Sequence, residues 1–105
     1  MEIVETPIFT KLITENLSDD DYCEIQMALI ENPALGSKIK GSGGIRKLRW
    51  GYDRKGKRGG CRIIYYWYME DHELLMLLFY KKNELDELTG DQLKKLRNTV
   101  ERELK

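Results

Sequence analysis

The sequence predicts one small α+β domain, in which an antiparallel β-sheet packs against helices. Its 105 residues are enough for a single core, so one domain covering residues 1–105 is expected. Hydrophobic residues make up 41% of the chain and charged residues 34%, which are the proportions of a folded protein. The hydrophobic period changes from helical to two after the glycine-rich residues 41–44. Together these features predict the order β-α-α-β-β-β-α.

The first third of the chain is predicted to hold a short strand and two helices. The strand is expected at residues 3–5. Thr6 and Pro7 then provide an N-cap and a proline at the first helical position, so a helix should follow. This first helix is expected to run to about Asn16.

The second helix is predicted to begin after Ser18. This hydroxyl can cap the helix, and the three carboxylates that follow it lie in the first turn, where the helix dipole favours negative charge. Apolar residues at spacings of three and four give the helix one face to bury. Its end is expected near Glu31, because Pro33 and Gly36 follow and break helical geometry.

Three strands are predicted after the second helix. In the first of them, residues 45–52, positions 48, 50 and 52 are apolar or aromatic, whereas Lys47 and Arg49 face the opposite side together. A glycine- and lysine-rich loop at residues 53–60 leads to residues 62–69, whose β-branched and aromatic content favours a strand. Two cations are therefore expected side by side on one sheet face.

The chain is predicted to end with a hairpin and a helix. Residues 70–73 form a polar tip, and the apolar run 74–80 has the length of a buried central strand. Thr89 and Gln92 match a capping box that begins the final helix.

Charge is distributed unevenly along the chain, although the formal net charge is zero. Residues 1–37 carry one base and eight acids, a net charge of −7. Residues 38–62 carry ten bases and one acid, a net charge of +9. Because glycines interleave these bases and let backbone approach a phosphate, the stretch 38–62 is predicted to bind a polyanion, with nucleic acid preferred.

The sequence gives little support for a membrane or a secreted protein. No apolar run approaches the roughly 20 residues that span a bilayer, and the N-terminus lacks the pattern of a secretory signal. Cys23 and Cys61 stand alone, so both are expected to be reduced packing residues rather than parts of a disulfide or zinc site. A cytoplasmic protein without a membrane partner is expected.

The basic stretch can also support RNA cleavage, because RNA carries its own nucleophile, the ribose 2′-OH. The single histidine, His72, lies at the predicted hairpin tip, so a mechanism with two histidines is excluded by count. A lysine among cations can lose its proton more readily, which makes Lys47 beside Arg49 a candidate base. A metal site is poorly supported, because Asp53 is the only carboxylate in the stretch.

Most aromatic side chains on the predicted strands are expected to lie in the core. Tyr66 and Tyr80 are the candidates for stacking against RNA bases on the cationic face.

Three segments resemble the RelE/HigB toxins of bacterial toxin–antitoxin pairs, and most of all the HigB-type branch. They are GGIRKLR at residues 43–49, KGKRGGCRIIYY at residues 55–66 and YKKNELDELT at residues 80–89. The resemblance spans nearly the whole chain and includes the predicted order of elements.

This resemblance implies a microbial-ribonuclease-like RelE fold and a toxin that inhibits translation. Such a toxin cleaves mRNA in the A site of the 30S ribosomal subunit, where it also contacts rRNA, by attack of the 2′-OH and without a metal or other cofactor. It also implies a cognate antitoxin as partner, expected to be HigA-like with a helix-turn-helix domain.

The resemblance extends to four candidate catalytic residues. Lys47 and Arg49 match the paired basic strand positions, with Lys47 as general base, and Arg62 matches an arginine that stabilises the transition-state phosphate. Lys82 lies in the matching C-terminal basic segment. Tyr80 is a nearby substitute candidate for the general acid, because Thr89 stands where some relatives have a catalytic tyrosine. Further contacts with RNA or the ribosome are assigned to Arg46, Arg54, Lys55, Lys57, Arg58, Tyr66 and Lys81.

The same segment departs from the family pattern, because Asn83 and Thr89 replace an arginine and a tyrosine found in relatives. Two other functions remain open, because the fold alone does not settle the activity. ParE-type relatives share the fold but inhibit DNA gyrase, and a basic module could bind RNA without cleaving it. The pairing of Lys47 with Arg49, followed by Arg62, favours the nuclease.

Overall fold

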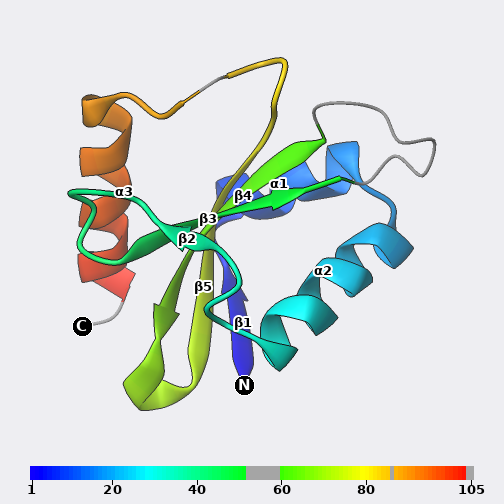
Figure 1. Ribbon diagram of the computed structural model, residues 1–105, viewed down its shortest axis with the longest axis horizontal. Helices are drawn as coiled ribbons and strands as arrows, with labels where there is room; N and C mark the ends of the chain where they lie inside the picture. The colour runs from blue at the N-terminus through cyan, green and yellow to red at the C-terminus, as the bar shows by residue number, and fades with distance from the viewer. Residues whose placement is uncertain (52–59, 86, 104–105) are drawn as a thin grey trace.

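The computed structural model describes residues 1–51, 60–85 and 87–103 of the chain. These residues form a five-stranded sheet in the order β1-β5-β4-β3-β2, and Figure 1 shows α1 and α2 against one of its faces and α3 against the other. The α+β class predicted from the sequence is confirmed. The elements are β1 (Glu2–Glu5), α1 (Pro7–Asn16), α2 (Asp19–Glu31), β2 (Ser37–Lys38), β3 (Ile45–Trp50), β4 (Cys61–Tyr68), the short 3₁₀ helix η1 (Met69–Asp71), β5 (Glu73–Lys81) and α3 (Gly90–Glu103).

The helix starts are where the capping residues predict them. The Thr6 hydroxyl accepts a hydrogen bond from the Phe9 N–H at 3.2 Å and donates one to the Leu77 carbonyl at 3.0 Å. It therefore caps α1 and also ties this helix to β5. Ser18 caps α2 in the same way, and the predicted capping box at Thr89 begins α3.

The sheet differs from the predicted one in two respects. β1 pairs with β5 in parallel, whereas the other neighbouring strands are antiparallel. β2 is an additional edge strand of two residues, Ser37 and Lys38, which pair with Lys47 and Arg46. A two-residue strand has no hydrophobic period, and the partner of β1 is set by contacts distant in the sequence, so neither feature is visible in local patterns.

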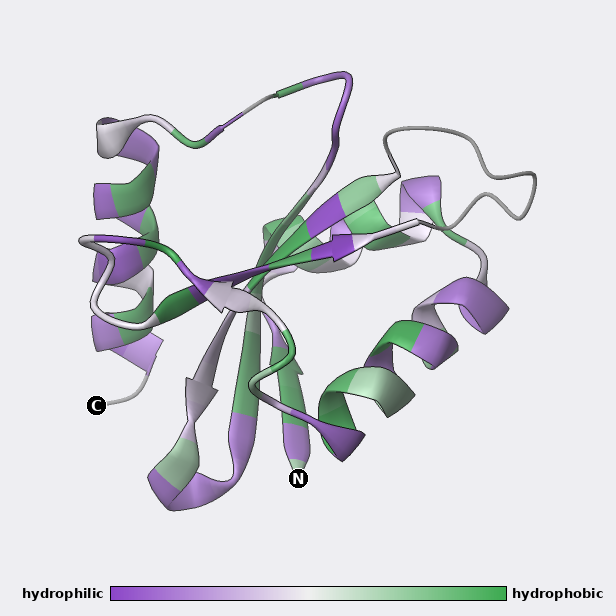
Figure 2. Ribbon diagram, viewed as in Figure 1, coloured by the Kyte–Doolittle hydropathy of each residue, from purple (hydrophilic) through white to green (hydrophobic). Residues whose placement is uncertain are grey.

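Two hydrophobic clusters lie on opposite faces of the sheet. Figure 2 shows hydrophobic stretches along the central strands and hydrophilic stretches on the helices. The first cluster joins α1 and α2 to the sheet through buried residues that include Phe9, Ile13, Ile25, Leu29, Ile63, Tyr65 and Phe79. The second joins α3 to the other face and includes Ile45, Ile64, Leu75, Leu77, Tyr80 and Val100, with Leu85, Leu88, Leu93 and Leu96 packed against it.

Tyr65 fixes the connection between α2 and β2 to the sheet. Its buried hydroxyl accepts a hydrogen bond from the Gly36 N–H at 2.9 Å and donates one to the Pro33 carbonyl at 2.7 Å. Gly36 is itself buried, and a Cβ at this position would lie 2.8 Å from Cε1 of Tyr65. This connection carries β2, which forms one wall of the candidate site, so Tyr65 also positions that wall.

The variant Tyr65→Phe is expected to lower the free energy of unfolding by about 1–3 kcal/mol, because it leaves the buried Gly36 N–H without its acceptor. Chemical denaturation of the purified protein measures this loss. Tyr68→Phe is a matched control, because Tyr68 lies only partly buried at the end of β4. Equal stability of the Tyr65→Phe variant and the wild type would contradict the anchoring role.

Gly60 allows the ends of β3 and β4 to approach closely. Its φ is +61°, and a Cβ there would lie 2.3 Å from the carbonyl oxygen of Trp50. Only glycine satisfies both conditions. Its carbonyl also accepts a hydrogen bond from the Lys82 N–H at 3.2 Å. Gly60 thus helps to hold the ends of three strands together, next to the basic residues of the candidate site.

Candidate functional site

Three polar side chains form a row across the sheet. Arg49 of β3 is paired with Arg62 of β4, and Arg62 is paired with Tyr80 of β5. Residues directly opposite each other on neighbouring strands point to the same face, so two guanidinium groups and a phenol lie in line. Lys47 lies two residues from Arg49 on the same face. The side-by-side placement of Lys47 and Arg49 predicted from the strand period is therefore confirmed.

This row is on the face that α3 covers only in part. α3 packs against Ile45 and Ile64, closer to the other end of β3. Arg49 remains exposed, and Lys47 and Arg62 are partly exposed. The end of the sheet with the paired cations is thus accessible to a large ligand.

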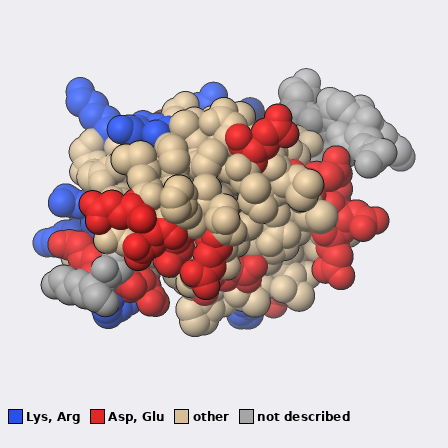
Figure 3. All heavy atoms as spheres, turned by 90° about the horizontal axis from the view of Figure 1, so that it is seen from below, with Lys and Arg blue, Asp and Glu red and all other residues tan. Residues whose placement is uncertain are grey.

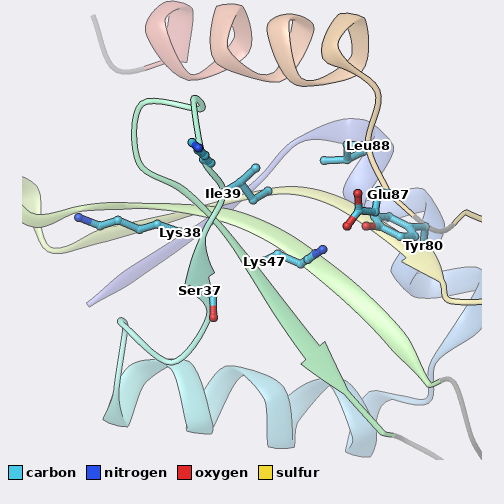
Figure 4. Close-up of a pocket in the computed structure, with 8 residues that line it drawn as sticks. Ser37, Lys38, Ile39, Lys47, Tyr80, Glu87 and Leu88 are labelled. Carbon is cyan, nitrogen blue, oxygen red and sulfur yellow. The ribbon is translucent and has the colours of Figure 1, made fainter.

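A cavity of about 300 Å³ adjoins the row. Its walls come from β2, β3, β5 and the connection that precedes α3. The lining residues are Ser37, Lys38, Ile39, Lys40, Lys47, Tyr80, Glu87 and Leu88. In Figure 4, Lys47 points toward Tyr80 and Glu87, whereas Lys38 points away from them. A second cavity, shared by Lys47 and Arg49, continues from β2 along the basic strand. Lys47 belongs to both cavities and so connects them.

Tyr80 has an unusual environment for a phenol. Its side chain is 6% exposed, and its hydroxyl finds no hydrogen-bond partner among the described residues. Burial raises the pKa of Tyr80, Glu87 raises it further, and the guanidinium groups of Arg62 and Arg49 oppose this rise. Tyr80 therefore keeps its proton at neutral pH and lies within the electrostatic influence of all three charged groups.

Arg62 is held in part by the strand that carries it. One of its terminal nitrogens, Nη1, donates a hydrogen bond to the Cys61 carbonyl at 3.0 Å. Cys61 itself is buried, and burial raises the pKa of its thiol to about 12. This confirms the packing role predicted for Cys61. Cys23, in contrast, is exposed on α2, so its predicted packing role is wrong.

Two predicted RNA-binding residues lie outside the row and its cavity. Nη1 of Arg46 donates hydrogen bonds to the carbonyls of Gly36 at 2.7 Å and Ala34 at 3.3 Å, so this side chain fastens the α2–β2 connection. Tyr66 packs in the second hydrophobic cluster and borders a separate cavity with Arg97 of α3. The strand alternation places Arg46 on the other face, and α3 covers the part of the sheet that carries Tyr66.

The remaining predicted basic contacts are placed only in part. Lys81 ends β5, where its N–H donates to Glu84 Oε1 at 3.1 Å, and Lys82 is exposed beside the start of β4. Neither lines the cavity that holds Lys47 and Tyr80. The other predicted contacts lie at positions outside the described residues: Arg54, Lys55, Lys57 and Arg58.

Of the eight residues that line the cavity, the sequence predicted Lys47 and Tyr80 as site residues and missed the other six. Lys38 and Lys40 belong to the basic stretch, but the brief β2 strand that places Lys38 gives no periodic signal. Glu87 and Leu88 lie in the polar connection before α3, about forty residues from Lys47 in the sequence. The only available signal was the acidic position within the YKKNELDELT segment, whose spatial neighbours the sequence does not reveal.

Charge is segregated over the surface. Figure 3 shows the end of the molecule with the N-terminus and η1, where acidic side chains spread over the surface and most Lys and Arg side chains lie at its margin. Exposed acids at this end include Glu2, Glu70 and Asp71. Arg62 lies at the opposite end of β4 from η1. A polyanion is therefore attracted to the end with the arginine row and repelled by the other.

The described residues show neither a candidate metal site nor a membrane-spanning helix. Residues 1–51, 60–85 and 87–103 contain no group of three or more His, Cys, Asp or Glu side chains that could hold a metal ion. Of the helices described, none is sufficiently long and apolar to cross a membrane. His72 is exposed and takes a left-handed conformation at the hairpin tip, as its predicted turn position requires.

Fold and site together define a small α+β domain with an open arginine row on one face of its sheet. Among solved structures, the chain is similar to the isolated RelE toxin of E. coli, with a TM-score of 0.59. The match covers 93% of this chain and 97% of that chain at 14% sequence identity. A scan against models of protein families finds no match. The chain therefore has the fold of the RelE toxin, as the resemblance in its sequence implied.

Proposed function

We propose that the protein is the toxin of a type II toxin–antitoxin pair and cleaves mRNA in the ribosomal A site. The observation that carries this proposal is the row of Arg49, Arg62 and Tyr80 beside the Lys47 cavity, in which the two arginines reach the surface and Tyr80 is buried. Such a row offers positive charge for a phosphate and a proton for a leaving group, which are the needs of RNA cleavage. The HigB-type branch remains a prediction.

The reaction follows from the chemistry of RNA. The 2′-oxygen attacks the adjacent phosphorus, the bond from phosphorus to the 5′-oxygen breaks, and the products carry a 2′,3′-cyclic phosphate and a 5′-hydroxyl. Arg49 and Arg62 bind the phosphate as negative charge develops on it. Tyr80 gives its proton to the leaving 5′-oxygen. Lys47 reaches into the adjoining cavity, where the sequence-based assignment makes it the general base.

The ribosome supplies the geometry that the protein lacks. In-line attack requires the 2′-oxygen, the phosphorus and the 5′-oxygen to be aligned, and a flexible single strand seldom adopts this arrangement. A shallow basic surface binds phosphates without fixing their angles. We expect the ribosome to hold the mRNA in this alignment while the toxin supplies charge and proton transfer. This role requires the protein to act in the cytoplasm.

A cognate antitoxin is the second proposed partner. Acidic side chains of such a partner could cover Arg49, Arg62 and Lys47, because complementary charge favours association with this surface. A HigA-like protein with a helix-turn-helix domain is the predicted form. The predicted contacts of Arg54, Lys55, Lys57 and Arg58 with rRNA stay predictions, because these residues lie outside the described part of the chain.

Induced expression of the protein in bacteria distinguishes the proposed mRNA cleavage from inhibition of DNA gyrase. Pulse labelling of new protein and new DNA is expected to show that protein synthesis stops first. A Lys47→Ala Arg62→Ala double variant provides the inactive control, and its circular dichroism spectrum shows whether it is folded. Arrest of DNA replication before any decline in protein synthesis would contradict the proposal and favour a ParE-like activity.

A further inference from the structure

The cavity beside the arginine row contains one carboxylate among its described lining residues, Glu87. The side chain comes from the connection between β5 and α3, whereas Lys47 comes from β3 and Tyr80 from β5. Figure 4 shows the carboxylate near the Tyr80 phenol, with Lys47 extending toward both. Three elements thus direct a carboxylate, a phenol and an ammonium group into one space.

Packing on both sides holds Glu87 in this position. Leu85 and Leu88 pack against the second hydrophobic cluster. The connection starts with a turn in which the Glu84 N–H donates to the Lys81 carbonyl at 3.0 Å, and it ends at the N-cap of α3. The charge of Glu87 also raises the pKa of Tyr80, which places the two groups within electrostatic reach of each other. Glu87 is nevertheless exposed, so a substrate can reach it.

Glu87 is better suited than Lys47 to accept a proton from the 2′-OH. A lysine accepts a proton only after it has lost its own, whereas an ionised carboxylate is a proton acceptor as it stands. Lys47 also lies between the cavity and Arg49, where a retained positive charge would help to hold the phosphate. The two side chains therefore suit different parts of the same reaction.

Resting on the proposed function, we propose that Glu87 is a catalytic residue that removes the proton from the attacking 2′-OH, with Lys47 acting as a phosphate-binding cation. The ribose of the cleaved nucleotide then occupies the cavity, and its 3′-phosphate lies at the Arg49–Arg62 row. The 2′-O–H bond breaks as its proton passes to Glu87, and the bond from the 2′-oxygen to phosphorus forms. The bond to the 5′-oxygen breaks, and Tyr80 protonates that oxygen. Exchange with water afterwards removes the proton from Glu87 and returns one to Tyr80.

Two substrates that differ only in the leaving atom distinguish a general base from a general acid. A synthetic mRNA in which sulfur replaces the 5′-oxygen at the cleavage site has a leaving group that needs no protonation. Loss of a general acid slows cleavage of the oxygen substrate only, whereas loss of a general base slows cleavage of both. The experiment measures single-turnover cleavage of both mRNAs on programmed ribosomes by wild type, Glu87→Gln and Tyr80→Phe.

Glu87→Gln is expected to slow cleavage of both substrates by about 10²-fold or more, the usual range for acid–base catalysis. Tyr80→Phe is expected to slow cleavage of the oxygen substrate alone. Glu84→Gln is the matched control, because it removes the same charge from the same connection. The glutamine keeps a side-chain oxygen that can accept the hydrogen bond from the Lys81 N–H. Its cleavage rates should match those of the wild type within about twofold.

Near-normal cleavage by Glu87→Gln, or its rescue by the sulfur substrate, would overturn the assignment while leaving the proposed function in place. Absence of cleavage by the wild type would overturn the proposed function and the assignment together. Because Glu87 is exposed and Gln has nearly the same shape, circular dichroism should show an unchanged fold for the variant.

Discussion

Replacement of Arg62 by alanine is expected to reduce ribosome-dependent cleavage by about 10²–10³-fold, the usual cost of removing one group that stabilises an anionic transition state. The reason is its position: Arg62 lies between Arg49 and Tyr80 in the row, so a phosphate bound there contacts its guanidinium. Primer extension on mRNA from programmed ribosomes measures the loss.

Two control variants test whether the effect is specific to Arg62 and whether it depends on the charge or on the planar shape of the guanidinium group. Arg97→Ala removes an exposed arginine from α3 and should leave cleavage unchanged. Arg62→Lys keeps the charge but loses the planar fork that binds two phosphate oxygens, so we expect only partial activity. Full activity of a folded Arg62→Ala protein would contradict the role of the row.

Replacement of Tyr80 by phenylalanine is expected to reduce cleavage by about 10²-fold or more without lowering stability. Cleavage should fall while stability is retained, because the buried hydroxyl has no hydrogen-bond partner in the described part of the chain. Removing an unpaired buried hydroxyl relieves a desolvation cost, so the free energy of unfolding should stay equal or rise by about 1 kcal/mol.

Cleavage assays and chemical denaturation of the same Tyr80→Phe preparation check both parts of this expectation. A full cleavage rate would remove Tyr80 as the general acid. A marked loss of stability would instead show that the hydroxyl has a structural partner. Tyr65→Phe, in contrast, is expected to lower the free energy of unfolding, because the Tyr65 hydroxyl has two backbone partners.

Local chemistry explains why so much of the fold could be predicted. Thr6, Ser18 and Thr89 each supply a side-chain oxygen to a helix N-terminus, and this requires only neighbouring residues. Strand alternation likewise placed Lys47 and Arg49 on one face. The parallel pairing of β1 with β5 depends on the whole chain and escaped local reasoning.

The candidate site was predictable where it follows strand alternation and not where it follows packing. The guanidinium of Arg46 is used by backbone carbonyls of the α2–β2 connection, and α3 covers the part of the sheet that carries Tyr66. The sequence alone does not show that contacts within the protein already occupy a basic or aromatic side chain. Packing also explains why Glu87 was missed. The packing of Leu85 and Leu88 brings this acidic residue to a basic cavity, and the sequence does not show that contact.

Primer extension on one mRNA, incubated with the purified protein in the presence and absence of translating ribosomes, tests the central claim most directly. The proposed function predicts cuts that require ribosomes and disappear in the folded Lys47→Ala Arg62→Ala variant. Intact mRNA in both incubations would contradict it and would favour gyrase inhibition or RNA binding without cleavage.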